Sequence, residues 1–476
     1  MKSFEELART APTGPVVQPA DVAAQVRSSG RLFVVLDDDP TGTQSVADLP
    51  VLTHWDVEDF TWAFGQRAPA VYVMTNSRSL DPEHAEQVNR EVAAAALQAS
   101  QQSGVPLVFV SRSDSTLRGH FPLEPDVLSD VLAAVGRPVD GVILVPAFAD
   151  AGRLTVDGIH YAGSRADGFI PVGESEFAKD ATFGYRSSDL RDWVVEKTGG
   201  GVSADSVVLI DLATLRSGPA AVAEILRDVS AGTVVAADCL EENDLLLLAA
   251  ALERAEAGGR HFVYRVGPPF MRARIGQVPH APLTRADVDR IADAGHGEHS
   301  VGGLIVVGSH VAQTTRQLDT LRARRTATEL EIDVAAVLDP SRREAHLQQV
   351  VRSAVDGLAR GNVVVSTTRR LVTGDDAGSS LGIARDVSRA VVDVVQGILK
   401  RCPPRFVVAK GGITSSDVAT HGLSIRRAFV RGPMLPGIVS LWEPSDGPAL
   451  GIPYVVFAGN VGDDQGLADV VDKLSA

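Results

Sequence analysis

The sequence predicts an α/β protein with two domains, each built on a mostly parallel or mixed sheet flanked by helices. First, 476 residues are long for a single core, so two domains are the natural expectation. Second, short apolar runs rich in β-branched residues alternate with helical patterns, as in sheets that are covered by helices. Third, this alternation lapses between residues 279 and 300, where Pro, Gly and His become frequent, and then resumes.

These observations divide the chain into three parts. Residues 1–30 are interrupted by Pro12-Thr13-Gly14-Pro15 and are expected to form an N-terminal extension. Residues 31–285 are expected to form the first domain and residues 286–476 the second. A boundary read from composition is placed only to within about a dozen residues.

Short apolar runs bounded by polar or turn residues mark the strands. In the first domain they span residues 32–36, 71–74, 107–110, 142–145, 207–210, 234–237 and 262–265, and in the second domain 303–307, 363–366, 406–409 and 454–458. A long helix is expected over residues 83–102, with Asp81 as N-cap, Pro82 at the first position and Gly104 as terminator.

The charge balance restricts the class of partner. The formal net charge is −15, whereas a general nucleic-acid binder normally carries a basic face. An anionic substrate remains compatible, because a local arginine cluster can reverse the field inside one cleft. No apolar run reaches membrane-spanning length and the acidic N-terminus has no signal-peptide pattern, so we expect a cytoplasmic protein without membrane contact. A homodimer is a fair expectation for a metabolic enzyme.

The first polar loop, Asp37-Asp38-Asp39-Pro40-Thr41-Gly42, directly follows a predicted strand. Adjacent carboxylates repel one another, so they stay together only where cations or hydrogen-bond donors offset the cost. One aspartate could accept a proton from a substrate hydroxyl while another binds a hydroxyl or hydrated Mg²⁺. The alternative is a solvated turn with an aspartate capping the next helix.

The loop Arg112-Ser113-Asp114-Ser115-Thr116-Leu117-Arg118-Gly119 also begins where a strand ends, which is where ligands bind in open parallel sheets. It combines a carboxylate, hydroxyls, guanidinium groups and a glycine, as expected for a site that binds a small polyhydroxylated anion. Arg78, after another strand, could converge with Arg112 and Arg118 on that anion, although a single arginine is more often a surface residue. Arg153 is a further possible anion contact, but its glycine-bounded turn favours a structural role.

Four small-residue loops follow strands of the second domain: Gly308-Ser309-His310, Ser366-Thr367-Thr368, the loop from Lys410 to Ser416, and Gly459-Asn460-Val461-Gly462. Glycines allow the backbone to approach a phosphate, which amide groups can then bind. Each loop alone could be a tight turn, but four in one domain favour a nucleotide site. Neither a Walker A loop nor a Gly-x-Gly-x-x-Gly fingerprint after a strand occurs.

In these segments, the chain from about residue 31 onwards resembles the four-carbon acid sugar kinase family. The segment from Asp114 to Gly119 matches the family's Asp-Ser-Thr-Leu-Arg-Gly signature, and Asp38-Asp39-Pro40-Thr41-Gly42 matches its Asp-Asp-Leu-Thr-Gly apart from the proline. Segments at Gly152, Gly308, Gly411 and Gly459 follow in the family's order. Arg112 stands where the family usually has Lys, and Thr43 where it has Ala. The segment from Arg265 to Phe270 also differs from the family's sequence there, which indicates a diverged branch.

The resemblance implies a sugar-acid domain followed by a nucleotide domain. It places Asp38, Asp39, Arg78, Asp114, Ser115 and Arg118 in the sugar-acid pocket, with Asp38 or Asp39 as the catalytic residue. Arg112 and Gly119, which belong to the same loop, are also expected to bind the substrate. It places Ser309, Ser366, Thr367, Gly411, Gly412, Ile413, Thr414 and Gly459 around ATP.

The expected reaction is transfer of the γ-phosphoryl group of ATP to the terminal hydroxyl of a threonate, erythronate or 3-oxo-tetronate. Mg²⁺ is expected to bridge the phosphates with few protein ligands. Two alternatives remain open: a sensor that binds the sugar acid and nucleotide without turnover, and a sugar-acid lyase or isomerase, which needs no nucleotide. ADP release distinguishes the first and ATP-induced thermal stabilisation the second.

Overall fold

The computed structural model describes residues 1–293, 299–370, 372 and 377–475. The chain forms two compact units, Met1–Leu49 with Trp55–Pro279, and Pro50–His54 with His280–Ala476. The division lies close to the expected boundary near residue 285, but the sequence did not indicate that residues 50–54 belong to the second unit. Residues 1–30 are part of the first unit, where Leu7, Val22 and Val26 are buried.

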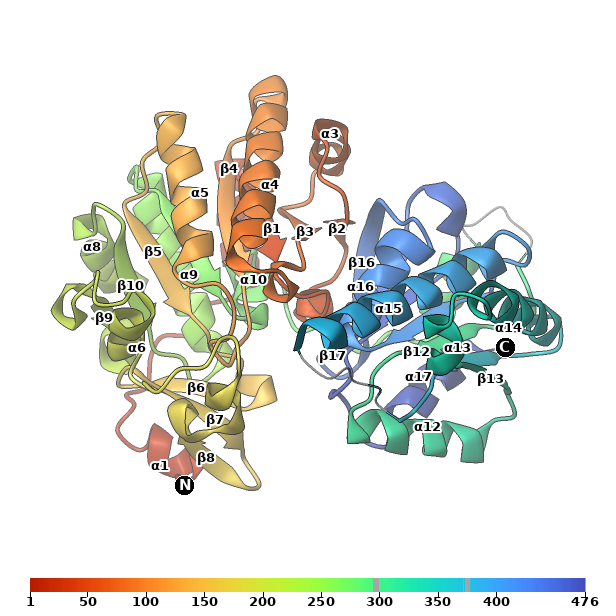
Figure 1. Cartoon of the computed structure of the whole chain (residues 1–476). Coiled ribbons are helices and arrows are strands. Elements are labelled where there is room, and N and C mark those ends of the chain that lie inside the picture. Colours follow the sequence, from red (N-terminus) through yellow and green to blue (C-terminus); the bar gives the residue numbers. More distant parts are fainter. Residues whose placement is uncertain (294–298, 371, 373–376, 476) are drawn as a thin grey trace. The chain divides into compact units, whose positions relative to one another are not determined.

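The first unit is built on seven parallel strands in the order β3-β1-β4-β11-β5-β10-β9 (Figure 1). In chain order they are β1 (Leu32–Asp37), β3 (Ala70–Met74), β4 (Leu107–Arg112), β5 (Gly141–Val145), β9 (Val208–Ile210), β10 (Thr233–Ala237) and β11 (Phe262–Val266). These are the seven strands predicted for this domain. Their continuous apolar runs are explained by burial on both faces, as in β1, where every position is buried.

The helices of the first unit form two groups (Figure 1). One group contains α3 (Val57–Gly65), α4 (Pro82–Ser103) and α5 (Leu123–Ala134), and the other α2 (Pro19–Ser29), α8 (Pro219–Asp228), α9 (Glu242–Ala257) and α10 (Pro268–Arg274). Shorter helices are α1 (Phe4–Ala8), α6 (Leu190–Lys197) and α7 (Leu212–Arg216).

The predicted helix over residues 83–102 is α4, and its ends are as expected. The Asp81 carboxylate accepts a hydrogen bond from the amide of His84 at 3.0 Å, and Gly104 ends the helix with a φ of 73°. This cap and terminator are determined locally.

A small antiparallel sheet that the sequence analysis did not predict follows β5. It consists of β6 (Arg153–Val156), β7 (Ile159–Ser164) and β8 (Gly168–Pro171). Asp157 and Gly158 connect the first two strands with φ values of 53° and 78°, which are the positive angles of a two-residue hairpin turn. The Asp-Gly pair was therefore a usable signal for this hairpin.

The second unit contains the parallel strands β13-β14-β12-β15-β18, followed by antiparallel β17 and β16 and then by β2. Their bounds are β2 (Leu49–Leu52), β12 (Leu304–Val307), β13 (Thr328–Ile332), β14 (Val363–Thr367), β15 (Val407–Lys410), β16 (Arg427–Leu435), β17 (Ile438–Pro444) and β18 (Tyr454–Phe457). The four strands predicted for this domain are present, and the sheet is mixed.

Two groups of helices accompany this sheet. They are α13 (Val334–Leu338), α14 (Arg343–Leu358) and α15 (Ala377–Leu399), and α11 (Arg285–Asp293), α12 (Ala312–Arg324) and α17 (Gly466–Leu474). A short helix, α16 (Gly412–Asp417), follows β15. Among the described residues, no helix is both long and apolar enough to span a membrane.

Candidate active site

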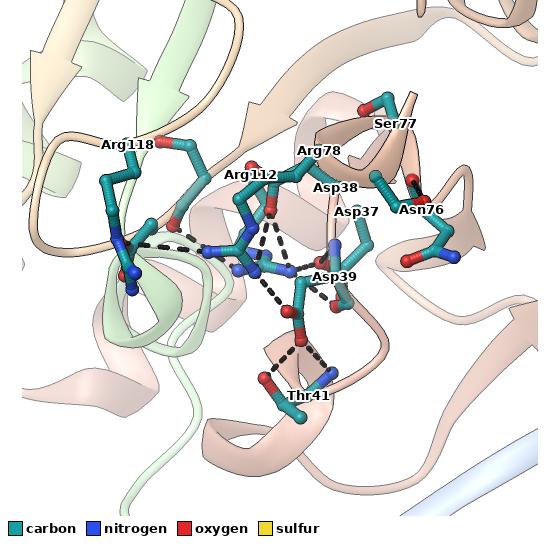
Figure 2. A network of polar contacts seen from close by, with 12 residues as sticks. Asp37, Asp38, Asp39, Thr41, Asn76, Ser77, Arg78, Arg112 and Arg118 are labelled. Carbon is teal, nitrogen blue, oxygen red and sulfur yellow. Dashed lines mark hydrogen bonds and ion pairs between the residues drawn. The ribbon is translucent and has the colours of Figure 1, made fainter. Parts of the chain in front are cut away.

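In the first unit, strand pairing brings the predicted acceptor residues together. Asp37 at the end of β1 lies beside Arg112 at the end of β4, and Val266 at the end of β11 lies on the other side of Arg112. The loops after β1, β3 and β4 therefore meet at one edge of the sheet, as Figure 2 shows. This edge is the carboxyl end of parallel strands, where ligands bind in open sheets.

Arg112 lies beneath the aspartate loop. Its side chain is 2% exposed and forms an ion pair with Asp37, which is fully buried. Its Nη2 lies 3.3 Å from Oδ1 of Asp38 and donates to the carbonyl oxygen of Asp39 at 2.6 Å. A Cβ atom on Gly42 would come within 2.2 Å of Asp37 Oδ2, so a larger residue would displace this pair. The structure thus places Arg112 where it fixes the three aspartates.

Arg78 faces the same aspartates from the loop after β3 (Figure 2). It forms an ion pair with Asp39, and its guanidinium nitrogens lie 3.8 Å from Asp38 and 3.8 Å from Asp114. These carboxylates raise the pKa of Arg78 although burial acts in the opposite direction. Arg78 and Arg112 are the cations that allow three consecutive aspartates to remain together.

Asp38 differs from its neighbours because it has two arginines at ion-pair distance but neither of its carboxylate oxygens is hydrogen-bonded by the described residues. Its side chain is 1% exposed, and neither carboxylate oxygen accepts a hydrogen bond in the described structure. Burial raises the pKa of Asp38 to about 8, although Arg78 acts to lower it. Both oxygens of this buried carboxylate are therefore available to accept hydrogen bonds.

Asp114 and Arg118 form the next part of the site. Arg118 Nε donates to Asp114 Oδ2 at 2.6 Å, and Thr116 donates its hydroxyl to the same carboxylate. Arg118 also lies 3.7 Å from Asp180. Burial alone would raise the pKa of Asp114, but Arg78 and Arg118 lower it to about 2. Asp114 is therefore ionised at neutral pH, and its carboxylate accepts hydrogen bonds.

Gly119 and Ser115 complete the predicted acceptor set. Gly119 has a φ of 118°, and a Cβ atom there would lie 2.8 Å from Nη2 of Arg265 and 3.0 Å from Oδ2 of Asp38. Ser115 is buried, and its carbonyl oxygen lies 2.8 Å from Nε2 of His160. Gly119 is thus required by both its backbone angle and its close neighbours.

Arg265 and Glu124 also belong to this site, although they were not predicted from the sequence. Both are buried and form an ion pair. Ser77 and Ser111 donate their hydroxyls to Glu124 at 2.5 and 2.9 Å, and Arg265 donates to Ser111 at 2.7 Å. The sequence contained one signal for this pair, because an arginine lies inside the apolar run of β11 and buried arginines are rare unless they are paired.

In the second unit, the predicted loops lie at the carboxyl ends of adjacent strands. β14, β12, β15 and β18 are neighbours, and Val307 of β12 pairs with Ser366 on one side and Lys410 on the other. A Cβ atom on Gly308 would lie 2.1 Å from Thr414 Oγ1, and one on Gly459 would lie 2.5 Å from Ser309 Oγ. The loops are therefore in close contact, and glycine permits this contact.

A cavity of about 370 Å³ opens beside these loops. Three predicted residues, Thr367, Ile413 and Thr414, line it. The other lining residues are Gly308, His310, Val334, Arg370, Val372, Ile383, Ala384, Val387, Ser388, Val391 and Asp417. Most of its lining side chains are apolar, as suits a flat aromatic base. The predicted residues Ser309, Ser366, Gly411, Gly412 and Gly459 lie in the adjoining strand ends and loops without lining the cavity.

Two basic side chains near this cavity were given no role from the sequence, although Lys410 opens one of the predicted loops. Arg369 Nη1 donates to the carbonyl oxygen of Ser309 at 2.6 Å, and its Nε is buried without a hydrogen-bond partner. Lys410 is fully buried, donates to the Ala458 carbonyl at 2.6 Å and lies 3.8 Å from the centre of the Phe457 ring. Burial lowers the pKa of Lys410 to about 7. Basic groups beside glycine loops suit a polyphosphate.

Comparison with known proteins identifies the family of the chain. Residues 33–274 match the family model described as a sugar-binding N-terminal domain, and residues 304–467 match a nucleotide-binding C-terminal domain. The chain belongs to the four-carbon acid sugar kinase family. It is thereby assigned to a group of sugar-acid kinases with one sugar-binding and one nucleotide-binding domain.

Three relatives carry kinase names. The chain is 28% identical to a D-erythronate kinase of Heliobacterium modesticaldum, over 74% of this chain and 73% of the relative. It is 27% identical to a D-threonate kinase of Salmonella typhimurium, over 64% and 63% of the two chains. A 3-oxo-isoapionate kinase of Paraburkholderia graminis is 31% identical over 33% of this chain and 36% of its own length.

Two solved structures share the fold of this acid sugar kinase family member. A protein from Salmonella typhimurium LT2 aligns with a TM-score of 0.65 at 20% identity, covering 92% of this chain and 98% of that one. A Haemophilus influenzae protein aligns with a TM-score of 0.62 at 17% identity, with the same coverage. At these identities the likeness concerns the fold.

Proposed function

We propose that this chain transfers the γ-phosphoryl group of ATP to the terminal hydroxyl of a four-carbon sugar acid. The observation that carries the proposal is Asp38, a buried carboxylate without a hydrogen-bond donor, next to arginines at the carboxyl edge of a parallel sheet. Phosphoryl transfer requires mainly alignment, charge neutralisation and a group that receives the hydroxyl proton.

Asp38 is assigned as the proton acceptor. A general base must be able to accept a proton near neutral pH. The raised pKa of Asp38 meets that condition. Asp39 is already engaged, because Thr41 donates its amide at 2.9 Å and its hydroxyl at 2.5 Å, and Arg78 forms an ion pair with it. We therefore assign Asp39 to orienting Arg78 and the substrate.

Asp114 and Arg118 bind the sugar acid in this proposal. The ionised Asp114 carboxylate accepts hydrogen bonds from substrate hydroxyls. The guanidinium group of Arg118 donates two hydrogen bonds to the carboxylate of the sugar acid. Because a guanidinium presents two parallel donors, it determines which end of the acid faces away from the reaction. The hydroxyl at the other end is then presented for phosphorylation.

The cavity of the second unit is assigned to ATP. Its apolar lining suits the base, whereas Arg369, Lys410 and the glycine loops suit the phosphates. The described residues contain no group of three or more His, Cys, Asp or Glu side chains that could hold a metal ion. This arrangement fits Mg²⁺ held chiefly by phosphates and water, with Asp417 as the carboxylate that lines the cavity. Bound in this way, Mg²⁺ neutralises charge on the phosphates.

A coupled assay of ADP release tests the proposal. D-erythronate, D-threonate and 3-oxo-tetronate are each supplied with ATP, and at least one should give turnover that depends on the acid. Calorimetric binding of an acid and ATP without ADP release would favour a sensor. Absence of ATP-induced thermal stabilisation would refute a kinase.

A further inference from the structure

The arginines of the acceptor site differ in how their charges are neutralised. Arg112 is paired with Asp37 and Asp38, and Arg78 with Asp38, Asp39 and Asp114. Arg118 is shared between Asp114 and Asp180, and Arg265 is paired with Glu124. A substrate carboxylate that binds these groups must compete with protein carboxylates that already hold them.

Arg153 differs from these four arginines. Within the described residues, no carboxylate lies at ion-pair distance from its guanidinium, and its buried Nε has no hydrogen-bond partner. Its Nη1 donates to the carbonyl oxygen of Ala151. Burial lowers the pKa of Arg153, and among nearby charges Asp114 raises it while Arg118 lowers it. A half-buried cation without a counter-ion is costly unless a ligand supplies one.

The position of Arg153 connects it with the acceptor loop. The centroid of the Phe177 ring lies 5.5 Å from the guanidinium carbon of Arg118 and 5.3 Å from that of Arg153. Both guanidinium groups therefore border one aromatic ring. Arg118 is also paired with Asp114 and Asp180, whereas Arg153 has no carboxylate partner among the described residues.

We propose that Arg153, together with Arg118 beside the Phe177 ring, binds the carboxylate of the sugar acid and makes the enzyme specific for acids over neutral sugars. This inference rests on the proposed function and adds the residue that supplies the uncompensated positive charge. In the sequence, the glycine-bounded turn favoured a structural role for Arg153. In the structure, β6 starts at Arg153 directly after the loop that follows β5, and we assign its side chain to substrate binding instead.

The test compares each acid with its primary amide, which has the same carbon chain but no charge. Wild type, R153M and R137M are assayed for ADP release with D-erythronate, D-threonate and their amides. Arg137 is the matched control, since it is partly buried, donates to the Leu107 carbonyl at 2.8 Å and has no ion-pair partner within the described residues. It lies near the start of β4, at the opposite edge of the sheet.

R153M should lower the ratio of kcat/KM for the acid to kcat/KM for the amide by about 100-fold, because a desolvated charge pair is lost. R137M should leave this ratio unchanged. An unchanged ratio in R153M, whether both substrates lose activity or neither does, overturns the inference. If R153M does not fold, R153K is measured in its place and should lower the ratio about 10-fold, because an ammonium lacks the planar fork.

Failure of the proposed function has a separate signature. If the wild type releases no ADP with any tetronate, the kinase proposal fails, and the same acid-to-amide ratio is then read from calorimetric binding to the wild type and to R153M. A ratio that falls in R153M still supports the carboxylate site. A wild type that binds none of D-erythronate, D-threonate and 3-oxo-tetronate refutes both proposals.

Discussion

The pH dependence of turnover tests the role of Asp38 most directly. Burial raises its pKa to about 8, with Arg78 acting in the opposite direction. A general base acts in its ionised form, so kcat/KM should rise with pH below this value. With a pKa of about 8, roughly 1% of the carboxyl group is ionised at pH 6 and half at pH 8, which predicts about a 50-fold rise in kcat/KM.

The assay is ADP release between pH 5.5 and 9, with saturating ATP and a sugar acid well below its KM. Asp38→Asn should lower kcat by about 10²- to 10⁴-fold and remove the inflection near pH 8. Asp39→Asn is the matched control, since it removes the neighbouring carboxylate and should keep an inflection, displaced to lower pH because the Asp39 charge helps to raise the pKa of Asp38. A flat wild-type profile, or an Asp38→Asn variant that keeps the wild-type inflection, would refute the assignment.

The same pKa predicts an effect on stability that does not depend on activity. Between about pH 4 and pH 8 the folded state holds a proton on Asp38 that the unfolded chain releases, so this group's contribution to stability falls as pH rises. A rise from 3.8 to about 8 corresponds to at most roughly 6 kcal/mol. The Tm of Asp38→Asn should therefore exceed that of the wild type by more at pH 8.5 than at pH 5. An equal difference at both values would contradict the raised pKa.

Three further changes test other parts of the structure. Arg118→Ala should lower kcat/KM for the sugar acid by about 100-fold through lost carboxylate binding, with little change in the Kd for ATP; an equal loss of ATP binding would show that the two sites are wrongly assigned. Gly308→Ala places a methyl group where it clashes with a hydroxyl and should weaken ATP binding at least about 10-fold, whereas Gly65→Ala, with open space around it, should not. Glu124→Gln should lower the free energy of unfolding in urea by about 3 kcal/mol because it leaves a buried arginine unpaired. Glu224→Gln, which removes an exposed ion pair, is the control and should lower the free energy of unfolding by less than about 0.5 kcal/mol.

Some features of the fold could be predicted because they depend on local sequence. A strand buried on both faces is a short continuous apolar run, and each such run in the first domain became a strand of the sheet. The cap at Asp81 and the terminator at Gly104 depend on residues within one turn of the helix. The hairpin of β16 and β17 was missed, although Pro436-Gly437 lies between its strands and is a strong turn signal.

The site was only partly predictable. Residue types and their position after strands identified the aspartate loop, Arg78 and the loop from Asp114 to Gly119, and the resemblance to the sugar-acid kinases added their roles. Arg265 and Glu124 were missed because each lies in an element that looks purely structural when taken alone. Lys410 was part of a predicted nucleotide loop, but its side chain was given no role, and Arg369 was missed because it occurs in no recognised phosphate-binding pattern.

By itself, the sequence determined the two α/β domains, the parallel strands and the loops that carry polar groups, since apolar patterning and turn chemistry act over short stretches of chain. Only the tertiary structure decided which arginines are neutralised and which can bind a ligand. Arg112 is paired because the β1–β4 register places it beside Asp37, and Arg153 is unpaired because no carboxylate of the described chain lies against it. Ion pairing depends on distances between residues far apart in sequence, and those distances exist only once the sheet has formed.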